Sequence, residues 1–525
     1  MNYNKNILFL FIATLLFGCK KELLNTIPND RISSEIFWKT DKDATLAANA
    51  VYRYLGNSSD FFSWDGMTDI GHTNVPQSPE SFILKGQYDA LNSRVSREWV
   101  DAYAGIRAAN TFMGNIDKVE TTNQPLIDRL KGEVRVLRAY LYIRLASLYG
   151  DVPLITSEIT LEESKSVSRT PVAQVWDFIA TELTESAALL PNTQAEKGRI
   201  TKGAALALNA RAMLYAGRFD KAAVAAGQVM NLNTYQLYAS YENLFTYGAE
   251  NNKEVILNIE YVKDIFSNDV FAVMGPFSQK NSKSRFVPTK NLVDAYEMLN
   301  GKDISDPASG FDPYNPYKDR DPRLKYSVYV PGSVLPDNKI YNPKPGSGTA
   351  DAVGISFQAT NTGFNLKKYI NKEDLVQPAN GGINIILLRY AEVLLTYAEA
   401  KIESDQIDQS VLDAINLVRQ RADVHMPAIT TLLPQDEMRK IVRKERLVEL
   451  AFEGLRFIDI RRWKIAEQVM PGIIYGMTYT DSNGDLQTIE VEAWSNSFDA
   501  SRDYLWPIPQ KETELNSSLT QNPNW

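Results

Sequence analysis

The sequence is poor in the side chains that most often hold metals and in runs that span membranes. Its 525 residues include one cysteine and two histidines, which excludes an internal disulfide framework and a cysteine-rich zinc site. Lysine and arginine total 56 against 64 acidic residues, so a formal net charge of −8 gives no general basis for holding nucleic acid. Beyond the N-terminus, no apolar run reaches the ~18 residues of a membrane-spanning helix. We therefore predict no metal, no cofactor and no nucleic-acid partner.

The N-terminus has the order of an export signal. Lys5 precedes an apolar run, Ile7 to Phe17, whose length of about 11 residues is too short to span a bilayer. Leu16-Phe17-Gly18-Cys19 then resembles the lipobox of bacterial lipoproteins, in which the cysteine thiol receives a diacylglyceryl group. We therefore expect residues 1–18 to be a signal peptide and Cys19 to carry lipid, so that the mature chain, 19–525, is anchored to a membrane.

Helical periodicity fills much of the remaining chain. In residues 126–149, apolar side chains recur every three or four positions and share one face: Val134, Leu137, Leu141, Leu145 and Leu148. Further helices are predicted at about 41–54, 95–117, 172–190, 201–216, 219–230, 386–403, 411–422 and 435–452. Gly217-Arg218 is so short a turn that its two helices must be antiparallel, and it resembles a tetratricopeptide turn. The predicted fold class is mainly α, with tetratricopeptide-like helical repeats within about 41–230 and 386–453.

Two segments lack this periodicity. Residues 261–385 are rich in turns and aromatic side chains, so we expect an irregular insertion rather than a plain or disordered loop. Residues 504–525 read as an extended Pro- and Asn-rich tail that its aromatic side chains hold against the body. Between them, Met477–Thr480 and Leu486–Val491 flank Asn483-Gly484, a pair that favours a tight β-hairpin turn.

Three glutamates spaced four residues apart on one helical face call for positive partners. They are Glu445, Glu449 and Glu453, and like charges at this spacing cost roughly 0.2–0.5 kcal/mol per pair. Arginines close by in the sequence are expected to fold back as bidentate partners: Arg456, Arg461 and Arg462. An acid–base carboxylate pair is the alternative, which the absence of a neighbouring histidine or nucleophile disfavours.

Other motifs carry little chemistry. No sequence pattern of a P-loop, a H-E-x-x-H zinc protease or a G-x-S-x-G hydrolase occurs. Residues at the predicted hairpin match four positions of a calcium loop, but a plain turn is favoured because Leu486 stands where that loop needs glycine. The four are Asp481, Asn483, Asp485 and Glu492. His72 lies among loop aromatics and is either a ligand contact or, more commonly for a lone histidine, a polar surface residue.

Several motifs in order resemble the RagB/SusD family of Bacteroidetes outer-membrane lipoproteins. They include Tyr149-Gly150-Asp151-Val152-Pro153-Leu154, Leu388-Arg389-Tyr390-Ala391-Glu392 and Glu449-Leu450-Ala451-Phe452-Glu453-Gly454. The most specific segment is the C-terminus, Tyr504-Leu505-Trp506-Pro507-Ile508-Pro509 through Gln521-Asn522-Pro523-Asn524-Trp525. The resemblance covers most of the chain and implies one SusD-like domain, in which helical repeats pack against a loop-rich half.

The resemblance also implies a function without catalysis. Such proteins bind a nutrient, usually a glycan, at the outer membrane facing the cell exterior, and pass it to a TonB-dependent SusC-like transporter. Members with other cargoes, including peptides, leave the cargo open. Two further interpretations remain: a glycoside hydrolase, whose two carboxylates would lie about 5–9.5 Å apart, and a protein scaffold that binds no ligand.

Aromatic side chains in loops give the candidate ligand site. Sugar rings bind on aromatic faces, while planar polar side chains bond their hydroxyls. The segment 59–65 combines both, and the resemblance implies a site formed by this region and the insertion. The candidates are Phe61, Trp64, Asp65, Asp69 and Asn74, followed by Phe266, Asn268, Phe271, Phe277, Lys280 and Arg285. The alternative is that these aromatic rings only seal the loops against the core.

Overall fold

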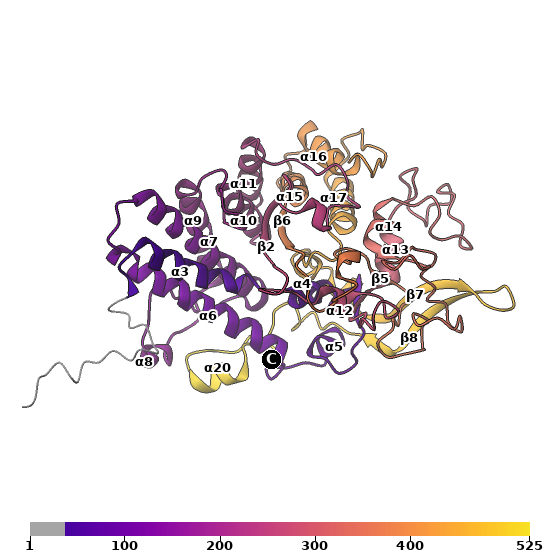
Figure 1. Ribbon diagram of the computed structural model, residues 1–525, viewed down its shortest axis with the longest axis horizontal. Helices are drawn as coiled ribbons and strands as arrows, with labels where there is room; N and C mark the ends of the chain where they lie inside the picture. Colours follow the sequence, from indigo (N-terminus) through magenta and orange to yellow (C-terminus); the bar gives the residue numbers. More distant parts are fainter. Residues whose placement is uncertain (1–36) are drawn as a thin grey trace, which may run out of the picture.

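Two structurally different halves lie side by side in the protein (Figure 1). The structure, a computed structural model, describes residues 37–525, without the side chains at 492–494. Long helices fill the left and upper parts of the view, and short elements joined by long loops fill the right. This arrangement confirms the predicted fold class. The expected signal peptide, 1–18, and the lipidation site, Cys19, lie outside the described residues.

The helical half contains nearly all the long helices. They are α3 (Asp41–Tyr52), α6 (Ser93–Asn115), α7 (Gln124–Tyr149), α9 (Val172–Leu189), α10 (Lys202–Tyr215), α11 (Phe219–Asn231), α15 (Tyr390–Glu403), α16 (Gln409–Arg419) and α17 (Gln435–Glu449). The apolar stripe predicted for α7 is buried throughout. Gly217 takes a φ of 68° after α10, and α11 returns beside α10 as the tetratricopeptide-like turn predicts. Within the part of the chain that is described, no helix combines the length and apolar character of a membrane span.

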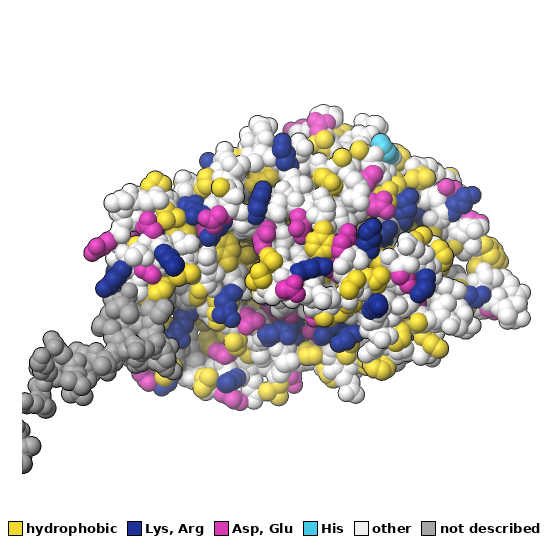
Figure 2. All heavy atoms as spheres, viewed as in Figure 1, with side chains coloured by type: hydrophobic (Ala, Val, Ile, Leu, Met, Phe, Trp, Pro, Cys, Tyr) yellow, Lys and Arg dark blue, Asp and Glu magenta, His cyan; other side chains and the backbone are white. Residues whose placement is uncertain are grey.

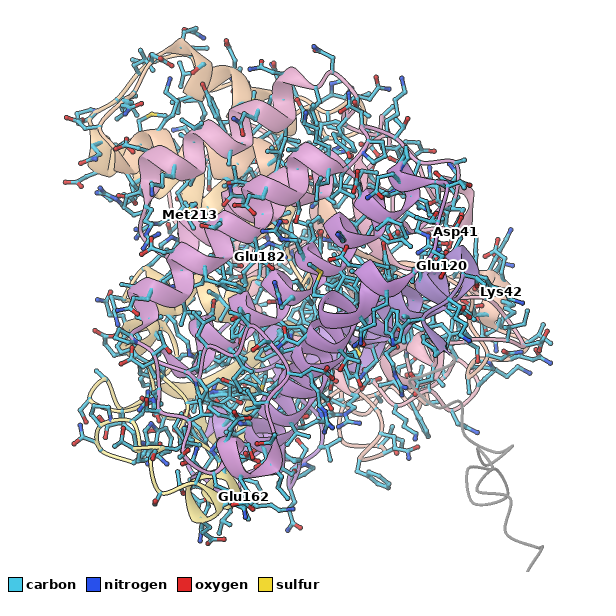
Figure 3. All side chains as sticks on the ribbon, turned by 90° about the vertical axis from the view of Figure 1, so that its left-hand side faces the viewer. Asp41, Lys42, Glu120, Glu162, Glu182 and Met213 are labelled. Atoms are coloured by element: carbon cyan, nitrogen blue, oxygen red, sulfur yellow. The ribbon has the colours of Figure 1, made fainter. Side chains whose placement is uncertain are left out.

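Buried ion pairs tie neighbouring helices together. Seen from the helical end, Glu182 lies among the packed helices (Figure 3). Its carboxylate accepts hydrogen bonds from Arg138, at 2.6 Å, and from Arg135, at 2.9 Å. Because an unpaired buried charge costs several kcal/mol, these arginines fix how α7 packs on α9.

One predicted helix begins later than expected. Residues 385–389 form the strand β6 (Ile385–Arg389), which pairs antiparallel with β2 (Val255–Ile259), and α15 starts only at Tyr390. The run Ile385-Ile386-Leu387-Leu388 is continuously apolar, and such a short run does not distinguish a buried strand from a helix.

The loop-rich half confirms the predicted irregular insertion. Its elements are short: α12 (Val270–Met274), β3 (Phe286–Pro288), α13 (Lys290–Ala295), α14 (Arg323–Ser327), β4 (Val328–Tyr329), β5 (Asn365–Leu366) and η5 (Lys372–Asp374). The segment between α3 and α6, expected to be a loop, contains short elements. They include α4 (Ser58–Asp65), β1 (Gly71–Thr73) and α5 (Pro79–Leu84). β1 pairs with β3 and β4 with β5, each antiparallel. The β1–β3 pair fastens the insertion to the N-terminal segment, and the β4–β5 pair joins two parts of the insertion.

The predicted hairpin is present, whereas the tail predicted to be extended, 504–525, contains a short helix, α20 (Gln510–Leu515). β7 (Gly472–Thr480) and β8 (Leu486–Asn496) form an antiparallel hairpin that projects at the right of Figure 1. The Asp481 carboxylate accepts hydrogen bonds from the turn N–H groups of Asn483 and Asp485, as a plain turn requires. In the tail, Trp506 is fully buried, and the ring of Trp525 lies against that of Tyr88.

A buried ion-pair network joins the two halves at α17. Arg323 of α14 contacts Glu445 at 2.5 Å and Glu449 at 3.0 Å, while Arg389 contacts Glu449 at 2.7 Å. Lys368, next to β5, contacts Glu453 at 2.8 Å. Burial alone would raise the pKa of Glu449, but Arg421, Arg389 and Arg323 outweigh it and hold that pKa far below its usual range. The structural role predicted for the three glutamates is therefore confirmed.

The predicted partners of these glutamates are wrong. Arg456 pairs instead with Asp69, and Arg462 pairs with Glu399 and Asp459. Arg461 lies with its guanidinium 3.5 Å from the centre of the Phe457 ring and donates to the Phe457 carbonyl. Closeness in sequence misled the prediction, since the true partners lie 26 to 126 residues away in the chain and only the tertiary fold brings them close.

Candidate functional site

The predicted aromatic segment at residues 59–65 is mostly an interior element. Asn57 is the N-cap of α4, and its side-chain oxygen accepts a hydrogen bond from the N–H of Asp60. In Trp64, the leading candidate for sugar stacking, the ring centre lies 4.4 Å from the Arg94 guanidinium and 5.6 Å from the stacked ring of Trp506. These two contacts occupy the faces of the indole, so Trp64 offers an edge rather than a stacking surface.

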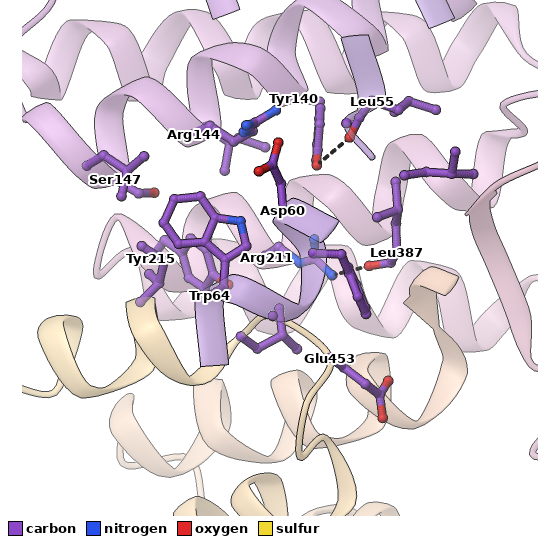
Figure 4. A pocket seen from close by; sticks show the side chains of 18 of the residues that line it. Leu55, Asp60, Trp64, Tyr140, Arg144, Ser147, Arg211, Tyr215, Leu387 and Glu453 are labelled. Atoms are coloured by element: carbon purple, nitrogen blue, oxygen red, sulfur yellow. Dashed lines mark hydrogen bonds between the residues drawn. The ribbon is translucent and has the colours of Figure 1, made fainter. Parts of the chain in front are cut away.

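Phe61 and Trp64 border an internal cavity at the junction of the two halves (Figure 4). The cavity has a volume of about 100 Å³ and is lined mainly by apolar side chains. Its charged lining residues are already paired, Arg211 with Glu392 at 2.6 Å for example. Ligand sites usually measure ~300–1,000 Å³, so this cavity is too small for a sugar chain.

Asp65 and Asp69 fasten α4 to the turn that follows α17. The Asp65 carboxylate accepts hydrogen bonds from the backbone N–H groups of Gly454 and Arg456, both at 3.0 Å. Burial raises the pKa of Asp65 to about 7, against the lowering effect of those two donors. Asp69 receives a bidentate contact from the Arg456 guanidinium, at 2.9 and 2.7 Å. Both carboxylates are buried and bonded to protein, so neither faces the solvent where a ligand would arrive.

Asn268 and Phe271 also face the interior. Asn268 is buried, and its side-chain amide donates to the carbonyl of Ile383 at 2.8 Å. Phe271 is almost completely buried in the core beside α12. Of this predicted group, Phe266 is the exposed aromatic residue: 56% of its surface is accessible, and its ring stacks parallel to Tyr261 at 5.1 Å.

His72 is buried as well, contrary to the expectation of a polar surface residue. It lies in β1, paired opposite Val287 of β3. Burial lowers the pKa of His72 to about 3, and the charge of Lys85 adds to this shift. The imidazole is therefore neutral at physiological pH and belongs to the scaffold beneath the loops.

The remaining candidates meet on the surface of the loop-rich half. Asn74 is buried and holds two loops together: its N–H donates to the Arg285 carbonyl at 2.7 Å, and its side-chain amide donates to the Ala359 carbonyl at 2.6 Å. Next to these bonds, Val75 is 41% exposed and Phe357 is 82% exposed. A buried amide thus fixes two apolar side chains that face solvent. We name the loops 73–76, 277–285 and 355–359 the loop platform.

Polar and charged side chains complete the loop platform. Arg285 is one-third exposed, and its guanidinium lies 3.7 Å from the Glu80 carboxylate. Phe277 is half-buried and Lys280 is exposed. Lys280, with a φ of 56°, and Ser284, with a φ of 42°, take left-handed backbone conformations that non-glycine residues rarely adopt. Such strain persists only where the surroundings hold it, and it gathers at binding surfaces.

Sequence reasoning missed Phe357, the most exposed aromatic side chain on this surface. Its signal was an apolar pair, Ile355 and Phe357, alternating with polar residues in the middle of a turn-rich segment. Phe277, Lys280, Arg285 and Asn74 lie in the loop platform, whereas Phe61, Trp64 and Asp65 belong to α4 and Asp69 to the loop that follows it.

The loop platform offers apolar contact and planar hydrogen-bonding groups without a reactive pair. In the described residues, no cluster of three or more histidine, cysteine or acidic side chains is arranged to hold a metal ion. Positive and negative side chains are mixed over the face in Figure 2, which is hollowed across its middle. The mixture of exposed apolar and polar side chains on the loop platform suits a neutral or weakly charged ligand with apolar faces and hydroxyl groups.

Comparison with known proteins places the chain in a family. The model described as the SusD family matches residues 242–525, over half of the chain, and a model described as "Starch-binding associating with outer membrane" matches residues 45–214. A SusD-like protein of Formosa agariphila, P2, is 27% identical over 98% of both chains.

Solved structures agree with these matches. The crystal structure of a SusD-like carbohydrate-binding protein from Bacteroides fragilis superposes with a TM-score of 0.85 and 31% identity, covering 92% of this chain and 100% of that one. A second SusD-like protein of the same organism reaches a TM-score of 0.83 at 26% identity over 95% of this chain. With a family model over more than half of its length and the same fold throughout, the chain belongs to the SusD family.

Proposed function

We propose that the protein captures oligosaccharides on the loop platform at the bacterial outer membrane. The observation that carries the proposal is the pair of exposed apolar side chains, Val75 and Phe357, fixed by the buried amide of Asn74. An exposed aromatic ring is costly in water unless it packs or binds, and the apolar face of a sugar ring covers it well. Arg285, Lys280 and Gln358 supply hydrogen-bonding groups around it.

Family membership supports the choice of ligand. The relative from Bacteroides fragilis that is 31% identical is named a carbohydrate-binding protein, and the family model over residues 45–214 is described as starch-binding. The cargo of other family members includes peptides, so a peptide ligand on the same platform is the second possibility that a binding panel resolves.

The proposal includes a membrane anchor and a transporter. Lipid on Cys19 would hold the platform at the outer membrane facing the exterior, where a TonB-dependent SusC-like transporter receives the cargo. Tethering beside the transporter raises the effective concentration of captured ligand, so a modest affinity suffices. The helical half offers the extended surface that repeat scaffolds use for protein contacts.

We further propose that the protein does not hydrolyse its ligand. The conspicuous buried carboxylates, Glu445, Glu449 and Glu453, are saturated by arginine and lysine. A glycosidase needs one carboxyl group that titrates near the working pH beside a second at the scissile bond. Arginine and lysine partners hold the pKa values of Glu449 and Glu453 below their usual range, and all three glutamates are buried away from solvent.

Binding by isothermal titration tests the proposal directly. We expect the mature protein to bind one or more members of a panel of α- and β-linked glucans, mannans, xylans and peptides, and Phe357→Ala to weaken platform binding about tenfold. Tyr314→Ala is the matched control, because Tyr314 is a 60% exposed aromatic residue of the insertion outside the platform. Unchanged affinity in Phe357→Ala would contradict the platform.

Two further readouts separate the rival functions. Product analysis after incubation with polysaccharide should show no chain shortening; shortening would indicate a glycoside hydrolase. Mass spectrometry of the protein purified from membranes should show acyl groups on Cys19, and a β-barrel transporter should co-purify. An unmodified thiol and no barrel partner would contradict the anchoring and transfer steps while leaving ligand binding intact.

A further inference from the structure

A groove between the two halves forms a second candidate site, away from the loop platform. Two adjoining cavities of about 390 and 290 Å³ share the loop 196–199 and Asn258 in their linings. Their walls come from the end of α3, from the loop 192–201 and from β2. Each volume falls at or near the ~300–1,000 Å³ of ligand sites, and neither lining includes a residue of the loop platform.

Phe266 lies in the wall of the larger cavity with its ring held flat. The Tyr261 ring supports it from behind, 5.1 Å away and only 7° from parallel, and the Tyr261 hydroxyl is itself fixed by accepting a hydrogen bond from the N–H of Ser58. With 56% of Phe266 exposed, one face of this ring is supported and the other is open. A rigid ring with a free face is the element on which a pyranose stacks.

Asn258 presents an unused hydrogen-bond acceptor to both cavities. It is 95% buried, being only 5% exposed, and its amide nitrogen donates to Glu260 at 2.9 Å. Its side-chain oxygen accepts no hydrogen bond from residues 37–525 as described. The register of β2 against β6 shifts between Leu257 and Asn258, and such bulges re-aim a side chain at a site. An acceptor left open in a groove can receive a hydrogen bond from a ligand hydroxyl group.

Four cations and two carboxylates line the groove: Arg53, Lys197, Arg199, Lys253, Glu196 and Glu260. Arg199 contacts Glu196 at 2.8 Å and Glu133 at 3.2 Å, and donates to the Asn49 side chain at 2.7 Å. Its guanidinium also lies over the Tyr52 ring. This pairing neutralises Arg199, and the other cations of the lining carry N–H groups that can donate to the hydroxyl groups of a neutral sugar.

We propose that this groove is a second binding site that takes a neutral oligosaccharide. A sugar ring stacks on the open face of Phe266, one of its hydroxyl groups donates to the Asn258 oxygen, and Glu260 and Asn49 bond neighbouring hydroxyls. Amide and carboxylate side chains match hydroxyl donors and acceptors without requiring a charged ligand. Two sites on one chain allow a long glycan to be held at two points, which strengthens capture through avidity.

The test is a two-site titration that compares matched variants. Maltoheptaose, laminarihexaose, and mannan, galactan and xylan oligosaccharides of similar length are titrated into the mature wild-type protein, and at least one of them should bind with a stoichiometry of two. Phe266→Ala should lose one site, with its affinity falling about tenfold or more, and Phe266→Tyr should keep it. Ile265→Ala is the control, because Ile265 is 85% exposed next to Phe266 and is absent from the groove lining.

The outcomes distinguish this inference from the proposed platform. If the wild type shows one binding site, and that site is lost in Phe357→Ala but kept in Phe266→Ala, the groove is not a binding site and the platform is. One site that disappears in Phe266→Ala and persists in Phe357→Ala supports the groove and contradicts the platform. Equal losses in Phe266→Ala and Ile265→Ala, or no binding of any neutral oligosaccharide to the wild type, overturn the groove. Far-ultraviolet circular dichroism of each variant confirms folding, which the exposure of these side chains should preserve.

Discussion

The helical half and the loop-rich half satisfy their buried backbone groups by different means. In α7 and its neighbours, regular apolar stripes are buried and the backbone satisfies its own hydrogen bonds. In the loop-rich half, buried amide side chains do that work: Asn74, Asn268 and Asn371 each donate to carbonyl groups of other loop segments. Loops tied internally in this way hold exposed side chains still, which is what a binding surface requires.

The difference also shows in how charge is used. The helical half and α17 bury arginine–glutamate pairs where elements meet, whereas the loop platform leaves Lys280 and part of Arg285 toward solvent. Buried pairs fix geometry, and exposed cations remain available for a ligand. The two halves are therefore expected to respond differently to substitution: stability changes where pairs are buried, and affinity changes where side chains are exposed.

The largest effect is expected at Glu449, where the halves are joined. Glu449→Gln leaves Arg389, Arg421 and Arg323 with an incomplete set of charge partners, and breaking a buried pair typically costs about 3–5 kcal/mol. Urea unfolding measures this loss. The control is Glu437→Gln on the same helix, because Glu437 is half exposed and its pair with Lys440 should contribute under ~1 kcal/mol. Equal losses of unfolding free energy in Glu449→Gln and Glu437→Gln would show that the buried ion-pair network does not join the halves.

The second largest effect concerns the pH dependence set by His72 beneath the platform. Its pKa is about 3 in the folded protein against 6.5 when exposed, so the unfolded chain binds the proton first. The stability contributed by neutral His72 is complete above about pH 6.5 and decreases as the pH falls, by about 3 kcal/mol at about pH 4. His72→Gln should flatten the fall in thermal midpoint over this range. His425→Gln, at an exposed position, should leave the fall unchanged; a flattening there would contradict the assignment.

Trp64 and Phe357 give the sharpest comparison of core and platform. Trp64→Ala removes contacts with Trp506, Phe457 and Arg94, so we expect a loss of roughly 2–3 kcal/mol, below the range for fully buried aromatics. Its glycan affinity should change little once folding is maintained. Phe357→Ala should show the reverse, with stability within about 0.5 kcal/mol of the wild type and weaker binding. Weaker glycan binding in Trp64→Ala, without loss of stability, would show that Trp64 belongs to the binding site.

Most of the helical half could be predicted from the sequence because its signals are local. The stripe of Val134 to Leu148, the turn at Gly217 and the breaks at Gly150 and Pro191 each act within a few residues. The strand β6 could not be separated from α15, since Ile385–Leu388 forms a strand only because β2 lies beside it. The partners of Glu449 were equally out of reach, because Arg323 lies 126 residues earlier in the chain.

The candidate site was less predictable because composition does not reveal exposure. Trp64 and Phe266 are both loop aromatics in the sequence, yet the faces of one are covered by Arg94 and Trp506 while the other keeps an open face. Which ring is covered depends on the C-terminal tail, since Trp506 is 442 residues further along than Trp64. A pattern of aromatic and polar residues locates the loops of such a site, and long-range packing selects the residues that reach the ligand.

The smallest effect compares two capping boxes with the same chemistry. Thr40 caps α3 and Thr160 caps α8 (Leu161–Ser164), each accepting from the N–H three residues on. Thr40→Ala should cost about 1 kcal/mol of global stability in urea unfolding, because α3 buries Ala44, Ala48 and Val51 and cannot fray without exposing them. Thr160→Ala should cost much less, since α8 buries none of its residues and can open locally while the core stays folded. Equal losses would mean that α8 unfolds only with the whole helical half, so that its exposed turn is coupled to the core through contacts other than its own burial.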